Sequence, residues 1–68
     1  MNEETFNLSI RKFLKTVGVG SQREIEQAVD RARTEGRIAG HETFPATATL
    51  RVAGLDIEVR FDGEIRLE

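Results

Sequence analysis

The chain contains no cysteine, tryptophan or tyrosine, and only one proline and one histidine among its 68 residues. Without cysteine it can form neither a disulfide nor a thiolate metal site, and His41 alone cannot build an ordinary zinc site. The lack of cysteine fits a reducing compartment. We therefore expect no metal and no cofactor, and stability must come from packing or from a partner subunit.

Long apolar runs are also absent. No stretch approaches the ~20 apolar residues of a membrane span, and the acidic start at residues 1–4 has no apolar run behind it, unlike a signal peptide. We expect a cytoplasmic protein without membrane association. Residues 1–68 are expected to form a single domain, near the lower size limit for a self-sufficient core.

There is no excess of basic charge. The net charge is −2, with seven Lys/Arg and six Asp/Glu in residues 1–40 but three and six in residues 41–68. Because basic surface supplies most non-specific affinity for nucleic acids, this balance weakens a nucleic-acid function.

Apolar residues at helical spacing predict two helices, at about 3–17 and 22–35. Asn2 is the expected N-cap of the first, and Gly18 its terminator. Ser21 and Glu24 match the S-x-x-E capping box expected at the start of the second helix. Gly36 is the expected stop signal of that helix.

After the only proline, Pro45, the apolar period changes from 3.6 to 2, which predicts three strands at about 46–52, 55–60 and 64–67. A two-residue loop at 53–54 would pair Leu50 with Ile57 and Arg51 with Asp56. A three-residue loop at 61–63, with Gly63 left-handed, would join the second and third strands and pair Arg60 with Glu64 and Glu58 with Arg66. The expected fold class is α+β, with two helices on one face of a three-stranded antiparallel meander (α-α-β-β-β).

The segments NLSIRKFLKTVGVGSQREIE (7–26), PATATL (45–50) and VRFDGEI (59–65) carry a resemblance to a small family of uncharacterised bacterial proteins, a domain of unknown function. The resemblance implies that the chain is a complete protein. It implies no functional residues, since no activity is assigned to that family.

Two functions remain open, and the first is binding to another protein. On the first predicted helix Arg11, Lys12 and Lys15 cluster opposite the apolar stripe, with Leu8 among them. A leucine inside a basic patch can contact a partner while the charges steer an acidic surface toward it. We favour a small non-catalytic protein-interaction module of this kind.

Self-association is a related hypothesis. The first predicted strand has no lysine, and Arg51 is its only charged residue that would discourage pairing. Its open edge is therefore a template for pairing with a second copy. The partner is therefore expected to be an unknown protein or a second copy bound through a sheet edge.

The alternative function is DNA binding. Residues 13–29 are similar to the central pair of a helix-turn-helix, with Gly18 in the turn, and the strands that follow are similar to a wing. The expected DNA contacts are Gln22, Arg23, Gln27 and Arg31. The missing third helix and the phosphate-repelling Glu26 and Asp30 count against this hypothesis.

Enzymatic activity has weak support, and we expect none. Ser9 and Ser21 lack a nearby base in sequence, and His41 is interpreted as an ordinary surface histidine. Four carboxylates, Asp56, Glu58, Asp62 and Glu64, are expected on an open sheet face or in a turn rather than in a pocket. The position of Phe44, in the core or exposed, stays open.

Overall fold

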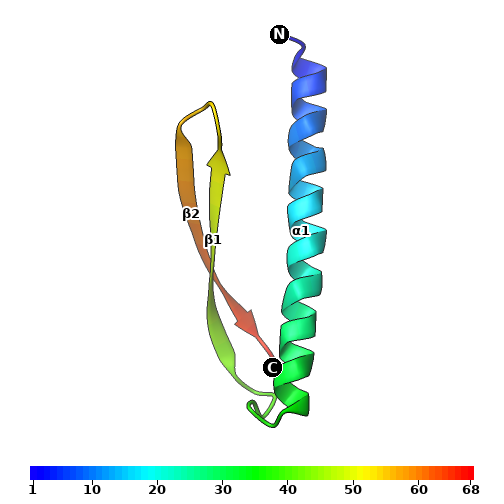
Figure 1. Cartoon of the computed structure of the whole chain (residues 1–68), viewed down its shortest axis with the longest axis vertical. Helices are drawn as coiled ribbons and strands as arrows, with labels where there is room; N and C mark the ends of the chain where they lie inside the picture. Colours follow the sequence, from blue (N-terminus) through cyan, green and yellow to red (C-terminus); the bar gives the residue numbers. More distant parts are fainter. The chain divides into compact units, whose positions relative to one another are not determined.

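The computed structural model describes residues 1–68 and has three elements in the order α-β-β (Figure 1). They are helix α1 (Glu3–Thr34) and strands β1 (Thr43–Val52) and β2 (Ile57–Arg66). The chain divides into two compact units, Met1–Arg37 and Ile38–Glu68. The prediction of two helices on a three-stranded meander is therefore wrong: one helix replaces the pair, and one two-stranded hairpin replaces the meander.

The start of α1 follows the sequence signals. The side chain of Asn2 accepts a hydrogen bond from the backbone N–H of Thr5 at 3.0 Å, which satisfies one of the unpaired donors of the first turn. Glu3 and Glu4 lie in that turn, where negative charge is favourable against the positive end of the helix dipole. The predicted N-cap is confirmed.

The expected break at Gly18 is absent, because α1 continues through Gly18, Val19, Gly20 and Ser21 without interruption. Gly18 does not adopt a positive φ, so it is not the left-handed residue that ends a helix. Each internal glycine costs a helix about 1 kcal/mol relative to alanine. A break would instead require a second helix to nucleate and would leave four unpaired backbone N–H or C=O groups at each new helix end.

The end of α1 is the one that Gly36 predicts. Gly36 has φ +73°, its N–H donates to the carbonyl of Arg33 at 3.0 Å, and the N–H of Arg37 donates to the carbonyl of Ala32 at 2.9 Å. These two bonds are those of a Schellman motif, which requires a left-handed residue after the cap. The cap itself is Glu35.

The apolar stripe of α1 runs past the glycines in phase, and this is the signal that identifies one helix. Ile10, Leu14 and Val17 are followed, after the polar Ser21, by Ile25, Ala28 and Ala32, and all seven residues are spaced at steps of three or four. Such steps keep side chains on one side of a continuous helix. A turn between two helices has no reason to preserve this phase.

The hairpin is one ladder of ten directly opposed pairs, from Thr43↔Arg66 to Val52↔Ile57. Opposed residues lie on the same face of a sheet, so every pair can be assigned to one of two faces. The apolar face consists of Phe44/Ile65, Ala46/Gly63, Ala48/Phe61, Leu50/Val59 and Val52/Ile57. The polar face consists of Thr43/Arg66, Pro45/Glu64, Thr47/Asp62, Thr49/Arg60 and Arg51/Glu58.

A four-residue loop, 53–56, connects the strands, in place of the predicted two-residue loop at 53–54. Gly54 (φ +92°) and Asp56 (φ +54°) supply its positive φ angles, and the N–H of Leu55 donates to the carbonyl of Val52 at 3.2 Å. The longer loop shifts the register, so Leu50 opposes Val59 rather than Ile57. A shift of two residues keeps the alternation of faces intact, so hydrophobic pattern alone cannot detect it.

The predicted turn at 61–63 and the separate strand at 64–67 are also wrong. Phe61, Asp62 and Gly63 are extended within β2, and Gly63 has no positive φ. An Asp-Gly pair is a common turn signal, but here it faces Ala46 and Thr47 across a regular ladder. The two predicted strands that flank it are therefore the two halves of β2.

Very little apolar surface is buried. Ala32 is the only buried apolar residue, and no large side chain is fully buried. The apolar stripe of α1 includes Phe6, Ile10, Phe13, Leu14, Val17 and Ile25, which are between 38% and 53% exposed. Helix α1 does not combine the length and the apolarity that crossing a membrane requires.

Candidate functional site

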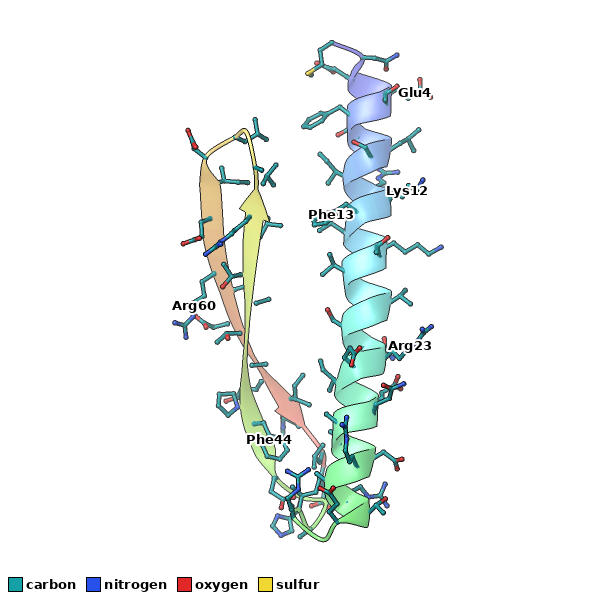
Figure 2. The ribbon with its side chains drawn as sticks, viewed as in Figure 1. Glu4, Lys12, Phe13, Arg23, Phe44 and Arg60 are labelled. Carbon is teal, nitrogen blue, oxygen red and sulfur yellow. The ribbon has the colours of Figure 1, made fainter.

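The four residues predicted to form a protein interface lie on one side of α1. Leu8, Arg11, Lys12 and Lys15 all fall within the first half of the helix, at spacings of three or four residues. Such spacings make them neighbours on one side. Figure 2 shows Lys12 pointing away from α1 on the side opposite Phe13, as the amphipathic pattern requires.

Val19 joins this group because the helix is continuous. It follows Lys15 by four residues and Leu8 by eleven, which is close to three full turns, so it lies on the same side. Leu8 is 56% exposed and Val19 is 53% exposed. We call Leu8, Arg11, Lys12, Lys15 and Val19 the basic face. Sequence reasoning missed Val19 because it placed this residue in a turn.

The four residues predicted to contact DNA do not share a side of α1. Gln22 and Arg31 are nine residues apart, about two and a half turns of a continuous helix, and therefore lie on opposite sides. Arg23 lies four residues beyond Val19, and Figure 2 shows it on the same side as Lys12. The turn that a helix-turn-helix requires is absent. DNA contact by Gln22, Arg23, Gln27 and Arg31 stays a prediction, but the helix-turn-helix geometry on which it was based is absent.

The polar face of the hairpin carries ion pairs that differ from the predicted ones. Arg51 pairs with Glu58, its direct cross-strand neighbour, instead of Asp56. Arg60 donates to Asp62 along the same strand at 2.8 Å, instead of pairing with Glu64. The side chains of both ion pairs are more than half exposed, so each contributes little to stability.

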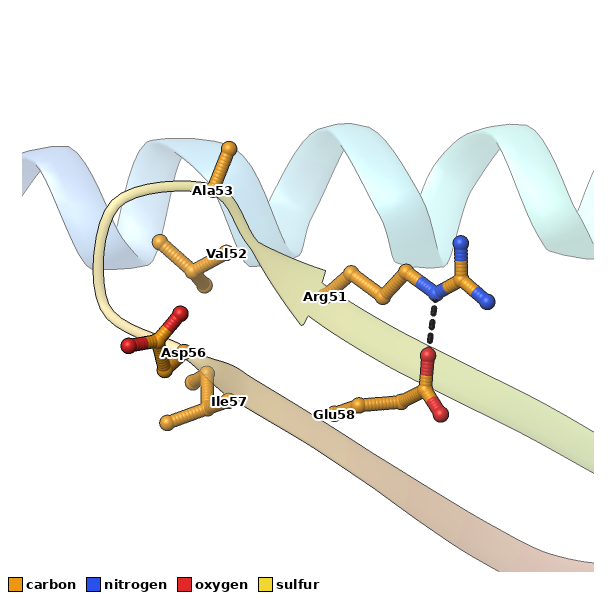
Figure 3. A pocket seen from close by; sticks show the side chains of 6 residues that line it. All are labelled: Arg51, Val52, Ala53, Asp56, Ile57 and Glu58. Carbon is orange, nitrogen blue, oxygen red and sulfur yellow. Dashed lines mark ion pairs between the residues drawn. The ribbon is translucent and has the colours of Figure 1, made fainter.

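An open depression lies at the loop end of the hairpin. Its lining is Arg51, Val52, Ala53, Asp56, Ile57 and Glu58, with the ion pair of Arg51 and Glu58 on one side (Figure 3). Two of the four candidate carboxylates, Asp56 and Glu58, therefore line it, while Asp62 and Glu64 belong to the opposite half of β2. The four do not converge on one point, and no group of three or more side chains in the chain could hold a metal ion.

Glu42, which sequence reasoning did not single out, closes a tight turn before β1. Its Oε2 accepts the N–H of Ala39 at 2.7 Å, and its Oε1 accepts the N–H groups of Gly40 at 2.8 Å and His41 at 3.0 Å. These donors, led by Ala39 and Gly40, lower the pKa of the Glu42 carboxyl from 4.5 to about 2. Gly40, at φ +113°, makes the turn possible.

His41 contributes to this turn only through its backbone, whose N–H donates to the Glu42 carboxylate, and its side chain is exposed. Phe44, whose position the sequence left open, lies on the apolar face of the hairpin opposite Ile65 and is half-buried (Figure 2). Ser9 and Ser21 both lie within α1, and the hydroxyl of Ser9 donates to the carbonyl of Phe6 at 2.7 Å.

The sequence matches a known protein family. Residues 1–68, the whole chain, match a family described as "Family of unknown function (DUF6494)". No curated protein and no solved structure matches the sequence.

Proposed function

We propose that this chain, which belongs to the DUF6494 family of unknown function, is a non-catalytic protein that binds an acidic partner protein through the basic face of α1. One observation carries the proposal: the continuous helix brings Leu8 and Val19 into one line, with Lys12 and Lys15 between them.

The side chains of the basic face are suited to binding the surface of another protein. Leu8 and Val19 are about half exposed, and each offers apolar area that a partner can remove from water. Lys12 and Lys15 between them, with Arg11 beside, attract carboxylates and raise the rate of encounter with an acidic surface. Isolated exposed apolar residues are ordinary, and what distinguishes Leu8 and Val19 is that they flank a basic row on one side of the same helix.

The non-catalytic part of the proposal draws support from the polar groups. The hydroxyls of Ser9 and Thr16 donate to carbonyls of their own helix, at 2.7 Å and 3.0 Å, rather than to a base. The Glu42 carboxylate is held ionised by three backbone donors, which is a structural arrangement and the opposite of a general acid.

Site-specific photocrosslinking in the native cells tests the proposal. A photoreactive residue replaces Leu8 or, separately, Val19, and the control position is Gln27 in the second half of α1. We expect one discrete adduct of the same mass from positions 8 and 19 and none from position 27. A loss of this adduct in K12E/K15E, but not in the matched charge reversal R31E/R33E, supports an acidic partner.

Two results would overturn the proposal. The first is equal adducts from all three positions, which indicates collision without a site. The second is an adduct from position 8 that persists unchanged in K12E/K15E, because a partner recognised by charge must respond to the reversal of two charges.

A further inference from the structure

The two edges of the hairpin differ in what their unpaired backbone groups present. The N–H of Leu67 donates to the carbonyl of Glu42 at 3.0 Å, so this pair, one step beyond Thr43↔Arg66, is a hydrogen-bonded pair. In an antiparallel ladder hydrogen-bonded pairs alternate with pairs whose N–H and C=O groups point away from the partner strand. The outward-pointing groups therefore belong to the five pairs of the polar face.

On β2 every residue with outward-pointing backbone groups carries a charge: Glu58, Arg60, Asp62, Glu64 and Arg66. On β1 the corresponding residues are mostly small and uncharged: Thr43, Pro45, Thr47, Thr49 and Arg51. Charged side chains along an edge discourage pairing with another strand. The edge of β2 is protected in this way, whereas the edge of β1 is protected only by Arg51 and by Pro45, which lacks an N–H.

We propose that β1 pairs through this edge, antiparallel, with β1 of a second copy of the chain, to form a four-stranded sheet in the order β2-β1-β1-β2. The proposal concerns the hairpin and is independent of the function assigned to the basic face of α1. A two-fold axis relates the copies, so each edge both donates and accepts along its length.

The backbone fixes which faces meet in such a sheet. Because only polar-face residues point their N–H and C=O groups outward, polar-face residues of one β1 must oppose polar-face residues of the other. Side chains of opposed residues lie on the same side of a sheet. Thr47 and Thr49 therefore meet a threonine, Pro45 or Arg51 of the second copy, depending on the register. The apolar faces of both hairpins join into one continuous apolar surface.

A second copy suits this edge for a reason of stability as well. A two-stranded hairpin is marginally stable in water, and either additional strands with an apolar face or packing against a helix is needed for independent stability. The hairpin has ten residues on its apolar face, yet none of them is buried. Pairing of two copies supplies the missing strands without any other component.

The edge of β2 is the competing surface. Pairing of two β2 strands about Asp62 would place Arg60 opposite Glu64 and Glu58 opposite Arg66 of the second copy, but it would also oppose two copies of Asp62. Arg60 is already paired with Asp62, and Glu58 with Arg51, inside each hairpin. Pairing through β2 would make existing ion pairs compete with new ones, whereas pairing through β1 disturbs only Arg51.

The test compares two proline variants of the full chain by sedimentation equilibrium from low micromolar to millimolar concentration. Thr49→Pro removes an outward N–H from β1, and Arg60→Pro removes the outward N–H of its direct partner on β2. Neither change removes a backbone hydrogen bond of the hairpin, and Pro45 already occupies an equivalent position. Arg60→Pro also removes the exposed ion pair between Arg60 and Asp62, which contributes little to stability. We expect a dimer of the wild-type chain that Thr49→Pro weakens about ten-fold or more, since two hydrogen bonds are lost per dimer.

Arg60→Pro should leave the dimer as strong as in the wild-type chain. If circular dichroism shows that Thr49→Pro prevents folding, T47K/T49K decides, because two lysines on the edge oppose pairing without altering the backbone. A chain that stays monomeric at millimolar concentration overturns the proposal. So does a dimer that survives T47K/T49K, or one that Arg60→Pro weakens as much as Thr49→Pro does.

Discussion

Gly63 lies directly opposite Ala46 in the hairpin, on the apolar face and well inside a ladder of ten pairs. Its φ is not positive, and a Cβ added to it would meet no heavy atom within 4 Å. A glycine in this position weakens the strand, because it loses more backbone freedom on folding than any other residue and adds no side chain to the face.

Gly63→Val should therefore stabilise the hairpin, by up to about 1 kcal/mol, since valine favours a pleated, half-buried surface. Chemical denaturation of the full chain measures the change. The matched control is Gly54→Val in the loop, where φ is +92° and a β-branched residue is strained, so stability should fall. A loss of stability in Gly63→Val similar to that in Gly54→Val would mean that residues 61–63 form a turn.

Gly18→Ala and Gly20→Ala test the continuity of α1. Both glycines lie inside the helix, and an added Cβ meets nothing within 4 Å at either position. Each substitution should stabilise α1 by about 1 kcal/mol. Thermal unfolding followed by circular dichroism at 222 nm measures the effect. Gly36→Ala is the control and should destabilise the chain, because φ at Gly36 is +73°. Destabilisation by Gly18→Ala would favour a turn at this point.

Asn2→Ala and Ser21→Ala distinguish the real N-cap from the apparent one. Asn2 accepts the N–H of Thr5, so its replacement should cost about 1 kcal/mol. Ser21 lies in mid-helix, so Ser21→Ala should be neutral or stabilising by up to about 0.5 kcal/mol. Helix content and thermal midpoints of the two variants give the comparison. A cost for Ser21→Ala equal to that for Asn2→Ala would place a helix start at residue 21.

Glu42 should make the turn before β1 sensitive to acid. Its pKa is lowered from 4.5 to about 2, so the folded chain holds the carboxylate more ionised than the unfolded chain does. The stabilisation is complete above pH 4.5 and is lost as the pH falls through about 2. A ¹³C NMR titration of the Glu42 carboxyl should give this low midpoint, together with faster exchange of the Gly40 and His41 amide protons in acid.

Glu42→Gln is the companion variant. Its amide oxygen can still accept the N–H groups of Gly40 and His41, but not that of Ala39. We expect a weaker turn whose stability no longer changes between pH 4.5 and 2. A Glu42 midpoint near 4.5, or amide exchange at Gly40 that is the same in both proteins across this range, would contradict the structure.

Local signals of the sequence were accurate where one residue and its neighbours determine the geometry. Asn2 as N-cap and Gly36 as C-terminal stop are both confirmed, because each satisfies backbone groups within a few residues. The same signals failed at Ser21 and at Asp62-Gly63. There a cap or a turn was possible locally, but the flanking segments were in phase for one longer element.

Among the candidate sites, Leu8, Arg11, Lys12 and Lys15 were brought together as predicted, since they span less than three turns of one helix. Val19 could not be added until the helix was known to continue. The separation of Gln22 and Arg31, by contrast, follows from the predicted helix at 22–35 itself, because nine residues correspond to about two and a half turns. The role of Glu42 depends on a turn conformation that includes Gly40 at φ +113°, and residue types alone did not point to it.

The sequence by itself determined the helical character of residues 3–17 and 22–34 and the alternation of apolar and polar residues in the strands, because the apolar residues recur with the helical period of 3.6 and the strand period of 2. The tertiary structure decided how many elements these segments form and which strand residues oppose each other. Hydrophobic alternation is satisfied equally by registers two residues apart, and glycine permits both a turn and a regular element. The ladder of ten pairs decides the register, and the unbroken backbone of α1 agrees with the in-phase apolar stripe that runs past the glycines.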